Sequence, residues 1–448
     1  MRSGWFDFPQ CGGYSTHYSR QNLRVMLLKS PQNVSIIGLG YVGLPLAVAL
    51  AEHCSVLGFD IDHGRTEALR QGQDRTGEVA AAALKHSKAT YTSKVGDLAG
   101  SDVFIIAVPT PVDDDKVPDL GPLRGACDSV GPHVTQGSIV VFESTVFPGA
   151  TEEICGPILE RHSGLVCGKD FFLGYSPERM NPGDKDHTVA NIVKVVAGQT
   201  PEVSAVLKDL YGRITKAGVF AAKDIQTAEA AKVIENAQRD INIAFINEAT
   251  QIFHRLGLSM YDVLEAANTK WNFLNFKPGL VGGHCIGVDP YYLAYRASQI
   301  GHDPDVLLAG RRTNDGMGAW IAQQISTALG SPARVLVLGL TFKENVPDLR
   351  NSGAYGLIKA LEDLGNDVVV HDACADSAEA KAAYGVELAP DISGNDFTCV
   401  VGAVAHDQYK TLEATTLSGL MADSGILADI KGIWRAKSFG PNIRRWEL

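Results

Sequence analysis

VSIIGLGYVG, residues 34–43, is the stretch that decides the fold of this 448-residue chain. Its first four residues predict a short buried strand, which runs directly into a G-x-G-x-x-G turn. An Ala/Leu/Val-rich helix over 44–53 and a second strand over 55–59 follow, and the second strand ends at Asp60. The order strand, glycine turn, helix, strand and acid predicts a Rossmann-type unit that binds a dinucleotide. A glycine-rich turn in some other α/β unit is the alternative.

Each residue of the turn has a separate expected task. Gly38 makes the tight turn, Gly40 lets the pyrophosphate approach the backbone, and Gly43 lets helix and strand pack closely. Tyr41 and Val42 lie where the helix begins, and the amides of a helix N-terminus bind phosphate. We therefore expect all five residues to line the cofactor site.

The acid after the second strand predicts which dinucleotide binds. Asp60 can accept hydrogen bonds from the ribose hydroxyls, and a carboxylate there disfavours a 2′-phosphate. NAD is therefore expected rather than NADP. Arg65, five residues further on, is a second expected cofactor contact.

The strand pattern continues over 102–108, 138–143 and 171–175. In open parallel sheets, ligands bind beyond the carboxyl ends of the strands. Three polar residues occupy such ends: Thr110, Thr145 and Glu178. A capping or turn role would explain any one of them, but three together favour a site at this edge.

Residues 225–256 form one long apolar-periodic stretch without Pro or Gly, which predicts a long helix. Lys232 and Asn236 are four residues apart and share a face of that helix. Such a pair is usually solvated, but the apolar neighbours favour a lysine that points into a cleft. A helix of this length between two sheet-rich regions is also suited to dimerisation.

Residues 280–292, LVGGHCIGVDPYY, place a lone thiol behind two glycines. Gly282 and Gly283 suit a loop pressed against a substrate, because glycine permits close approach and positive φ. Cys285 is then a candidate nucleophile, since a thiolate near a cation is reactive at neutral pH. Asp289 follows four residues later. A buried structural cysteine in a turn is the alternative.

A second doubly wound α/β domain is predicted after a helix over 305–329, with a boundary at Ser331-Pro332. It begins with a strand over 334–340, continues with a helix over 355–364 and a strand over 367–371, and alternates to about residue 430. It lacks G-x-G-x-x-G after its first strand. Lys343 at that strand end is the expected phosphate contact.

Composition sets limits on class and partners. The formal net charge of −11 argues against a broad surface for nucleic acid or an anionic membrane. The eight cysteines are scattered without a C-x-x-C pair, so we expect reduced thiols in a cytoplasmic protein. No apolar run is long enough to span a bilayer. Residues 1–32 are expected to form a tail outside the fold.

With these motifs in place, the chain resembles the UDP-glucose/GDP-mannose dehydrogenase family from about residue 33 to 435. The resemblance rests on seven motifs: GLGYVGLP (38–45), PTP (109–111), STVFPG (144–149), SPER (176–179), the Lys232/Asn236 helix, GGHCIGVDPYYL (282–293) and GLTFKENVPDLR (339–350).

The resemblance implies an α/β fold of two doubly wound Rossmann-like domains joined by a long-helix dimerisation domain. The implied domains are an NAD-binding domain (33–220), a helical central domain with the Cys loop (221–330) and a UDP-binding domain (331–448). A homodimer or higher homo-oligomer is implied as well.

The implied reaction is oxidation of the 6-hydroxymethyl of a nucleotide sugar to a carboxylate, with two NAD used in succession. Cys285 would trap the aldehyde as a thiohemiacetal, and a thioester would follow and be hydrolysed. The resemblance implies that Lys232 stabilises the oxyanion, and that Asn236 and Asp289 position water and assist proton transfer. It implies that Thr110 and Glu178 lie near the hydrolytic water. Lys343 would bind the UDP phosphates, and Arg350 would make a contact on the cofactor side.

Two departures from the family pattern bear on the sugar. The UDP-glucose enzymes have a lysine where this chain has Val288, and a second glutamate where it has Pro182. Glucose is therefore the less favoured sugar, and the group that activates the hydrolytic water stays open. The Cys loop with SPERMNPG resembles the branch that acts on UDP-N-acetyl-galactosamine or -glucosamine, which feeds O-antigen and capsule synthesis.

The alternatives are a UDP-glucose 6-dehydrogenase, a simple two-electron NAD-dependent dehydrogenase, and a nucleotide-sensing protein that has kept the fold. The simple dehydrogenase predicts no need for Cys285. The sensor predicts loss of the nucleophile or the lysine, and both are present. His284 invites a metal site, but no other ligands cluster near it in sequence, so no metal is expected.

Overall fold

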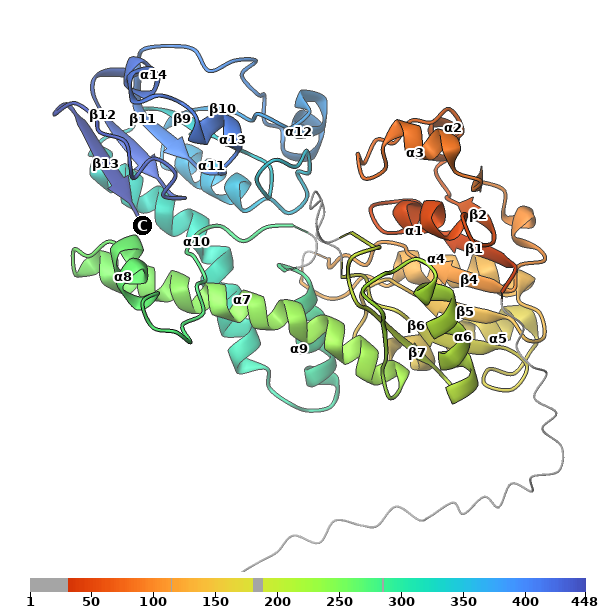
Figure 1. The fold of residues 1–448 in the computed structure, drawn as a ribbon. Coiled ribbons are helices and arrows are strands. Elements are labelled where there is room, and N and C mark those ends of the chain that lie inside the picture. Colours follow the sequence, from red (N-terminus) through yellow and green to blue (C-terminus); the bar gives the residue numbers. More distant parts are fainter. Residues whose placement is uncertain (1–30, 114, 180–187, 284–285) are drawn as a thin grey trace, which may run out of the picture.

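The structure is a computed structural model, and it describes residues 31–448 apart from 114, 180–187 and 284–285. Two sheet domains lie at opposite ends of the molecule, with the long helix α7 (Ile225–Arg255) and helix α10 (Asp305–Leu329) crossing between them (Figure 1). The α/β class with two Rossmann-like sheets is therefore confirmed.

The N-terminal sheet has eight strands in the order β3-β2-β1-β4-β5-β6-β7-β8. All neighbours are parallel except β6 and β7. The strand order reverses between β1 and β4, which opens a crevice for ligands at the carboxyl ends of the strands. The strands are β1 (Asn33–Ile37), β2 (Ser55–Phe59), β3 (Thr90–Thr92), β4 (Val103–Ile106), β5 (Ile139–Phe142), β6 (Phe172–Tyr175), β7 (Lys194–Gly198) and β8 (Val219–Ala221).

Alternate residues of these strands pack into two separate cores, one on each face of the sheet. Ile37, Phe104 and Ile106 belong to one core, and Ile36 and Ile105 to the other. Burial on both faces explains why the strands are near-continuous apolar runs. The covering helices are α1 (Gly43–Leu50), α2 (His63–Arg70), α3 (Ala81–His86), α4 (Gly121–Val130), α5 (Gly156–Ser163) and α6 (Pro201–Gly212), with short helical turns at Val95–Leu98, Gly131–His133 and Thr151–Cys155.

A side-chain cap marks the start of α7, and a glycine marks the end of α10. The side chain of Asp224 accepts the Thr227 N–H at 2.8 Å and caps the start of α7. Gly330, in a left-handed conformation, ends α10 at the predicted residue. Between these two helices lie α8 (Met260–Ala267) and α9 (Asp289–Gln299).

The C-terminal sheet has five parallel strands in the order β10-β9-β11-β12-β13. Its two faces also pack into separate cores, so it is doubly wound as predicted. The alternation does not stop near residue 430, because an edge strand over 443–447 pairs with β12. The elements are β9 (Arg334–Leu338), α11 (Gly353–Asp363), β10 (Asp367–His371), α12 (Ser377–Tyr384), β11 (Phe397–Gly402), α13 (Asp407–Lys410), α14 (Ala414–Gly419), β12 (Met421–Asp429) and β13 (Ile443–Glu447).

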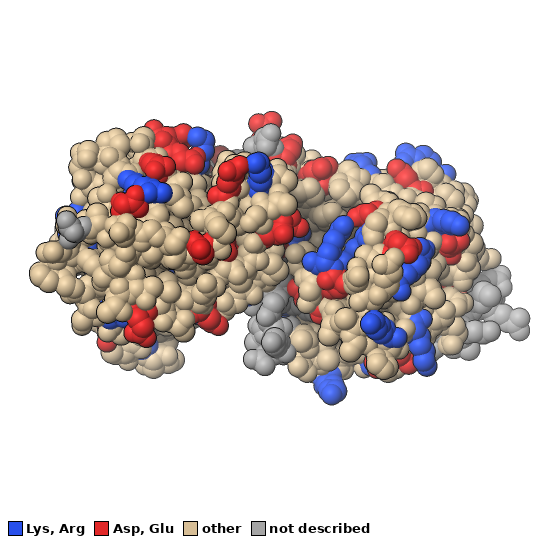
Figure 2. All heavy atoms as spheres, turned by 90° about the horizontal axis from the view of Figure 1, so that it is seen from above, with Lys and Arg blue, Asp and Glu red and all other residues tan. Residues whose placement is uncertain are grey.

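Charge is unevenly spread over the surface. On the face drawn in Figure 2, Lys and Arg gather mainly over the half that holds the N-terminal sheet domain, whereas Asp and Glu occur over both halves. Exposed basic residues in the α2–β3 region are Arg70, Arg75, Lys85, Lys88 and Lys94. Two of them are paired with acids of the same region, Arg70 with Glu67 and Arg75 with Asp62.

Candidate active site

The three glycines of the turn meet different surroundings. Gly38 has φ +93°, and a Cβ there would lie 2.7 Å from the Ala107 carbonyl oxygen. At Gly43 a Cβ would lie 1.9 Å from the Gly38 oxygen. At Gly40 it would meet nothing within 4 Å. The outer glycines are therefore required for packing, and the middle one leaves open space at the turn.

Asp60 braces this turn and keeps capacity for a ligand. One carboxylate oxygen accepts the Leu39 N–H at 2.8 Å and the other accepts the Asp62 N–H at 2.9 Å. Each oxygen has a second lone pair that can accept a ribose hydroxyl. Val42, the residue before α1, makes no side-chain hydrogen bond to the start of the helix, so its side chain does not cap the helix N-terminus. The turn fits a dinucleotide.

Arg65, the second expected cofactor contact, lies inside the fold. It is 2 % exposed, its Nε donates to the Leu39 carbonyl at 2.9 Å, and its Nη2 lies 2.8 Å from Asp74. The guanidinium thus supports the glycine turn from within. Direct contact with the cofactor stays a prediction.

The neighbouring strand ends converge as expected of a parallel sheet. Ser144 Oγ donates to the Val108 carbonyl at 2.6 Å and ties the end of β5 to the end of β4. Thr110 and Thr145, which follow these strands, are both half-buried. They lie at the edge where the sheet order reverses, and their contacts with ligands stay predictions.

Lys232, Asn236 and Asp289 meet between α7 and α9. Asn236 Nδ2 donates to Asp289 Oδ2 at 2.5 Å, and Lys232 Nζ lies 3.9 Å from the same oxygen. All three side chains are buried. The four-residue spacing on α7 brings the cation and the amide to one carboxylate, which begins α9.

Burial governs the charge of this cluster. It raises the pKa of Asp289 to about 6, although Lys232 and Asn236 act to lower it. An acid with a pKa near neutrality can exchange a proton at working pH. The cluster therefore offers a cation for a developing oxyanion and a carboxyl group for proton transfer.

The segment that leads to the thiol is seated against the C-terminal domain. A Cβ on Gly282 would lie 2.8 Å from the Asn351 carbonyl oxygen, and one on Gly283 would lie 2.8 Å from the Phe342 ring. Gly283 N–H donates to the Asn351 carbonyl at 3.2 Å. Both glycines are thus needed for close approach. Cys285, the predicted nucleophile, and His284 lie outside the described residues.

A buried amide clamp fixes the start of this segment. Asn247 on α7 accepts the Gly279 N–H at 2.8 Å and donates to the Gly279 carbonyl at 3.0 Å. Its Nδ2 also donates to Asn314 Oδ1 on α10 at 2.8 Å. Asn314 in turn donates to Asp240 Oδ1 at 2.7 Å, which Arg311 also contacts at 2.6 Å. The loop is held at its root by both central helices.

Glu178 belongs to a buried ion network in the N-terminal domain. Lys194 Nζ lies 2.9 Å from Glu143 Oε2 and 3.6 Å from Glu178 Oε2. Arg179 N–H donates to Glu178 Oε1 at 2.6 Å, and Arg179 also pairs with Glu235 on α7 at 2.9 Å. The carboxylate of the SPER motif is thus held beside the helix that carries Lys232.

Tyr41 and Arg350 join the two sheet domains. The Arg350 guanidinium lies 4.5 Å from the centre of the Tyr41 ring, and it also pairs with Asp348 at 2.7 Å. Arg350 therefore lies beside a residue of the glycine turn, and its contact with the cofactor stays a prediction. Lys343 lies half-buried in the same segment that follows β9.

Sequence reasoning missed the residues that hold the site in place. Their partners are distant in sequence: Lys194 pairs with Glu143, Asn247 with Gly279 and Asn314, and Arg311 with Asp240 as well as with the nearby Asp315. The only signal for them was a polar residue at a strand end or inside an apolar helix face, which by itself names no partner.

The glycine turn and the acid after β2 fit a dinucleotide, and the lysine–carboxylate cluster has the groups that oxidation of an alcohol needs. Together with the second sheet they define the class as NAD-dependent oxidoreductases with two Rossmann-like domains. Domain profiles of one family match nearly the whole described chain: the NAD binding domain over 32–215, the central domain over 226–316 and the UDP binding domain over 336–436. The chain belongs to the UDP-glucose/GDP-mannose dehydrogenase family.

Similar proteins span almost the full length. Protein CapL of Staphylococcus aureus is 51 % identical over 423 residues, which cover 93 % of this chain and all of CapL. The UDP-N-acetyl-D-glucosamine 6-dehydrogenase of Pseudomonas aeruginosa is 50 % identical, covering 89 % of this chain and 96 % of that protein. The solved UDP-D-ManNAc dehydrogenase of Pyrococcus horikoshii matches with a TM-score of 0.83 at 29 % identity, covering 92 % and 99 % of the chains. None of the helices in the described part of this chain combines the length and apolar character needed to cross a membrane.

Proposed function

We propose that the enzyme oxidises the C6 hydroxymethyl of a UDP-N-acetylhexosamine to the uronate. The observation that carries the proposal is the 50 % identity to a UDP-N-acetyl-D-glucosamine 6-dehydrogenase over 96 % of that protein. The buried Lys232–Asn236–Asp289 cluster supports it, because the cluster supplies the groups that alcohol oxidation needs.

The relatives favour the gluco configuration over the galacto one. A second UDP-N-acetyl-D-glucosamine 6-dehydrogenase, from Salmonella typhi, is 43 % identical. An NDP-N-acetyl-D-galactosaminuronic acid dehydrogenase from Ralstonia solanacearum is 31 % identical. UDP-N-acetylglucosamine is therefore the first substrate to test, ahead of its C4 epimer and of UDP-glucose.

The cluster on α7 acts on the substrate oxygen. Bound NAD supplies the hydride acceptor, and two molecules are needed in succession for each sugar. Asp289, with its pKa near neutrality, takes the proton released as the alcohol becomes a carbonyl, and Asn236 holds its carboxyl group in position. The Lys232 cation stabilises the negative oxygen that develops.

Cys285 divides the oxidation into two steps. Its thiolate adds to the C6 aldehyde carbon and forms a C–S bond, and the carbonyl oxygen takes back the proton held by Asp289 and becomes the thiohemiacetal hydroxyl. Loss of hydride from C6 and of the proton on that oxygen leaves a thioester. Water then adds to the thioester carbon, the C–S bond breaks, and the carboxylate and the free thiol result.

Water for the last step is assigned to Thr110 and Glu178. The buried Lys194 Nζ lies 3.6 Å from Glu178 Oε2 and helps to hold this carboxylate in place. Pro182, which takes the place of the family's second glutamate, falls outside the described residues. Glu178 is thus the carboxylate proposed to activate the water.

The central region of residues 221–330 is proposed to form a dimer through α7. Four residues of this helix, spaced by 7, 4 and 7, share one face: Ile234, Ile241, Phe245 and Ile252, here called the α7 stripe. Ile234, Phe245 and Ile252 are 59 %, 65 % and 52 % exposed. An apolar stripe of this kind is suited to burial against a second copy.

The flanking regions 33–220 and 331–448 are proposed as the NAD-binding and UDP-binding domains. Gly282, Gly283 and Lys343 would contact the UDP-sugar between them. We place the enzyme in the cytoplasm, where its uronate product would enter surface polysaccharide synthesis.

The test is to mix the purified protein with NAD and a panel of UDP-sugars and to count NADH formed per sugar consumed. The proposal predicts about two NADH per UDP-N-acetylglucosamine and no uronate from Cys285→Ala, as expected for covalent catalysis. Cys399→Ala, at a buried cysteine in β11, is the control and should keep the two-to-one ratio. A ratio of one, with an active Cys285→Ala, would instead identify a simple two-electron dehydrogenase.

A further inference from the structure

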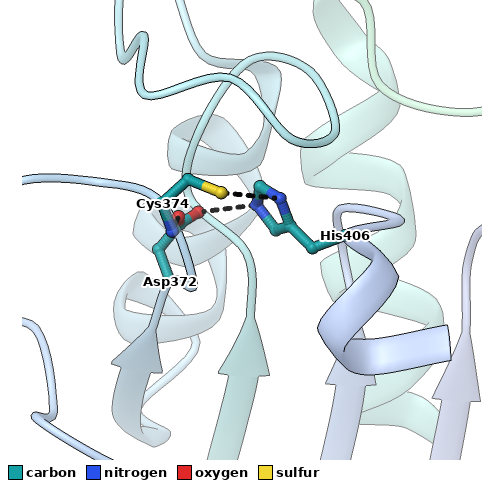
Figure 3. Close-up of side chains that lie close together, drawn as sticks. All are labelled: Asp372, Cys374 and His406. Atoms are coloured by element: carbon teal, nitrogen blue, oxygen red, sulfur yellow. Dashed lines mark hydrogen bonds and ion pairs between the residues drawn. The ribbon is translucent and has the colours of Figure 1, made fainter. Parts of the chain in front are cut away.

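Asp372, Cys374 and His406 form a cluster at the carboxyl ends of β10 and β11 that the proposed mechanism does not use (Figure 3). His406 is 1 % exposed. It lies between the acid that ends β10 and the segment that follows β9. The arrangement resembles a metal site, so the hydrogen bonds of each atom decide what it does.

The two ring nitrogens of His406 have different partners. Nδ1 accepts the Asn345 backbone N–H at 2.9 Å. A ring nitrogen that accepts carries no proton, so in the neutral ring the proton is on Nε2. Nε2 lies 2.9 Å from Thr341 Oγ1 and 3.2 Å from Asp372 Oδ2. Both sides of the ring are therefore occupied by protein groups.

Asp372 is equally committed to the protein. One of its oxygens accepts the Leu340 and Thr341 N–H groups, at 2.6 and 2.8 Å. The other accepts the Cys374 and Ala375 N–H groups, both at 2.8 Å. Burial acts to raise the pKa of Asp372, but the hydrogen bond with His406, together with those from the Thr341 and Leu340 N–H groups, holds this pKa well below its usual range. A metal ion would have to displace several backbone hydrogen bonds, so the cluster is a structural tether.

Asp372 corresponds to Asp60 of the first domain. Each acid ends the second strand of its unit and accepts the N–H of the residue after the first turn glycine. Asp60 keeps a half-exposed carboxylate, whereas Asp372 is 8 % exposed and faces His406. Asp60 can therefore still accept a ribose hydroxyl, whereas Asp372 binds a loop of the protein itself.

That loop is the segment Thr341–Asn345, which contains Lys343. Thr341 at its start contacts Nε2, and Asn345 at its end contacts Nδ1. Asn345 has φ +60°, a strained value for a residue other than glycine. Its Oδ1 also accepts the Asp407 N–H at 3.0 Å. A single histidine ring thus fixes both ends of the loop.

We propose that His406 is a positioning residue for the diphosphate of the substrate. By tying Thr341 to Asn345 it holds the intervening backbone in one conformation, so that Lys343 meets the phosphates without an ordering step. A preorganised loop binds more tightly because less freedom is lost on binding. The inference rests on the proposed function, in which Lys343 contacts the UDP phosphates.

Two variants separate the two sides of the ring. In His406→Asn the side-chain oxygen can occupy the place of Nδ1 and still accept the Asn345 N–H, and Thr341 stays held by Asp372. In His406→Gln the amide reaches the place of Nε2, and the Asn345 N–H loses its acceptor. We expect His406→Gln to weaken UDP binding about tenfold, the scale of one lost buried hydrogen bond, and His406→Asn to stay within about twofold of the unchanged protein.

The measurement is calorimetric titration of the full-length protein with UDP, and separately with NAD. NAD affinity should be the same in both variants, because the glycine turn is not touched. In turnover, His406→Gln should raise the KM for the UDP-sugar. Equal UDP affinity in the protein and in His406→Gln would overturn the inference, as would equal losses in both variants. Absence of UDP binding by the unchanged protein would instead contradict the proposed function.

Hydrogen exchange provides a test that needs no variant. The Asn345 N–H should exchange slowly in the unliganded protein, since it is donated to a buried ring. Exchange at the rate of an open loop would show that His406 does not hold the segment. This result would overturn the inference even if the substituted proteins did not fold.

Discussion

At the scale of the residue, the burial of Asp289 predicts how the rate of the enzyme depends on pH. Its pKa is raised to about 6 by burial, so the carboxylate needed to accept a proton forms as pH rises through that value. We expect kcat/KM for the UDP-sugar to rise with pH to a plateau above about 6. In Asp289→Asn this limb should vanish, with a loss of about 10²- to 10⁴-fold in rate. Initial rates between pH 5 and 8 check this.

The same pKa fixes the sign of a stability change. Because the folded pKa lies above the unfolded one, the contribution of Asp289 to the free energy of unfolding is complete below about pH 4 and is lost as pH rises through about 6. Denaturant titrations should show this loss flattened in Asp289→Asn. Asp305→Asn, at an exposed acid in the first turn of α10, is the control and should keep the slope. An unchanged rate limb in Asp289→Asn would remove this group from the proton transfer.

Residue pairs near in sequence were predictable, and distant ones were not. Lys232 and Asn236 lie one helical turn apart, so their shared face followed from helix geometry. Glu143 and Lys194 are 51 residues apart, and only the antiparallel pairing of β6 with β7 brings them together. A buried ion pair leaves no periodic signal in sequence, because each member is a single polar residue at the end of an apolar run.

At the scale of the element, different glycines of the turn are expected to serve packing and cofactor binding. We expect Gly40→Ala to fold normally, because its Cβ would meet nothing within 4 Å, but to bind NAD at least about tenfold more weakly by holding off the pyrophosphate. Gly43→Ala should lower the free energy of unfolding by about 1–3 kcal/mol, since its Cβ would overlap the Gly38 oxygen.

Thermal melts and calorimetric titration with NAD distinguish the two substitutions. Gly96→Ala, at a glycine that also faces open space but precedes β4, is the matched control and should change neither quantity. Full NAD affinity in Gly40→Ala would mean that the pyrophosphate does not approach the turn at this point.

Elements with a strong period had predictable bounds, whereas weakly patterned ones did not. The helices over 225–255 and 305–329 end within a residue of the prediction, because caps and glycine mark their ends. β13 was missed, since Ile443–Glu447 contains two arginines and a glutamate and no apolar run. It is an edge strand, whose outer side tolerates charge.

At the scale of the whole molecule, the α7 stripe predicts assembly. Phe245→Arg should convert a dimer into monomers, because by symmetry it places a cation at two positions of one apolar interface. Burying a phenylalanine is worth about 2–3 kcal/mol, so a loss at two copies is large. Light scattering coupled to size exclusion gives the mass directly.

The control is Val166→Arg, at a valine 49 % exposed in the turn between α5 and β6. It should leave the mass unchanged. If Phe245→Arg also left the mass unchanged, the stripe would not be the contact between copies, and the role of α7 would be confined to one subunit.

Helix α7 also sets the distance between the two ends of the Cys loop, residues 279–289. Asn236 holds Asp289 at one end of that loop, and Asn247 holds Gly279 at the other. The two asparagines are about three helical turns apart, which sets a span of roughly 16 Å along one face. A substitution elsewhere on the helix leaves the distance between the two asparagines unchanged. One inserted or deleted residue between the asparagines would turn one anchor about 100° away from the other, so the length of α7 is under tighter constraint than its composition.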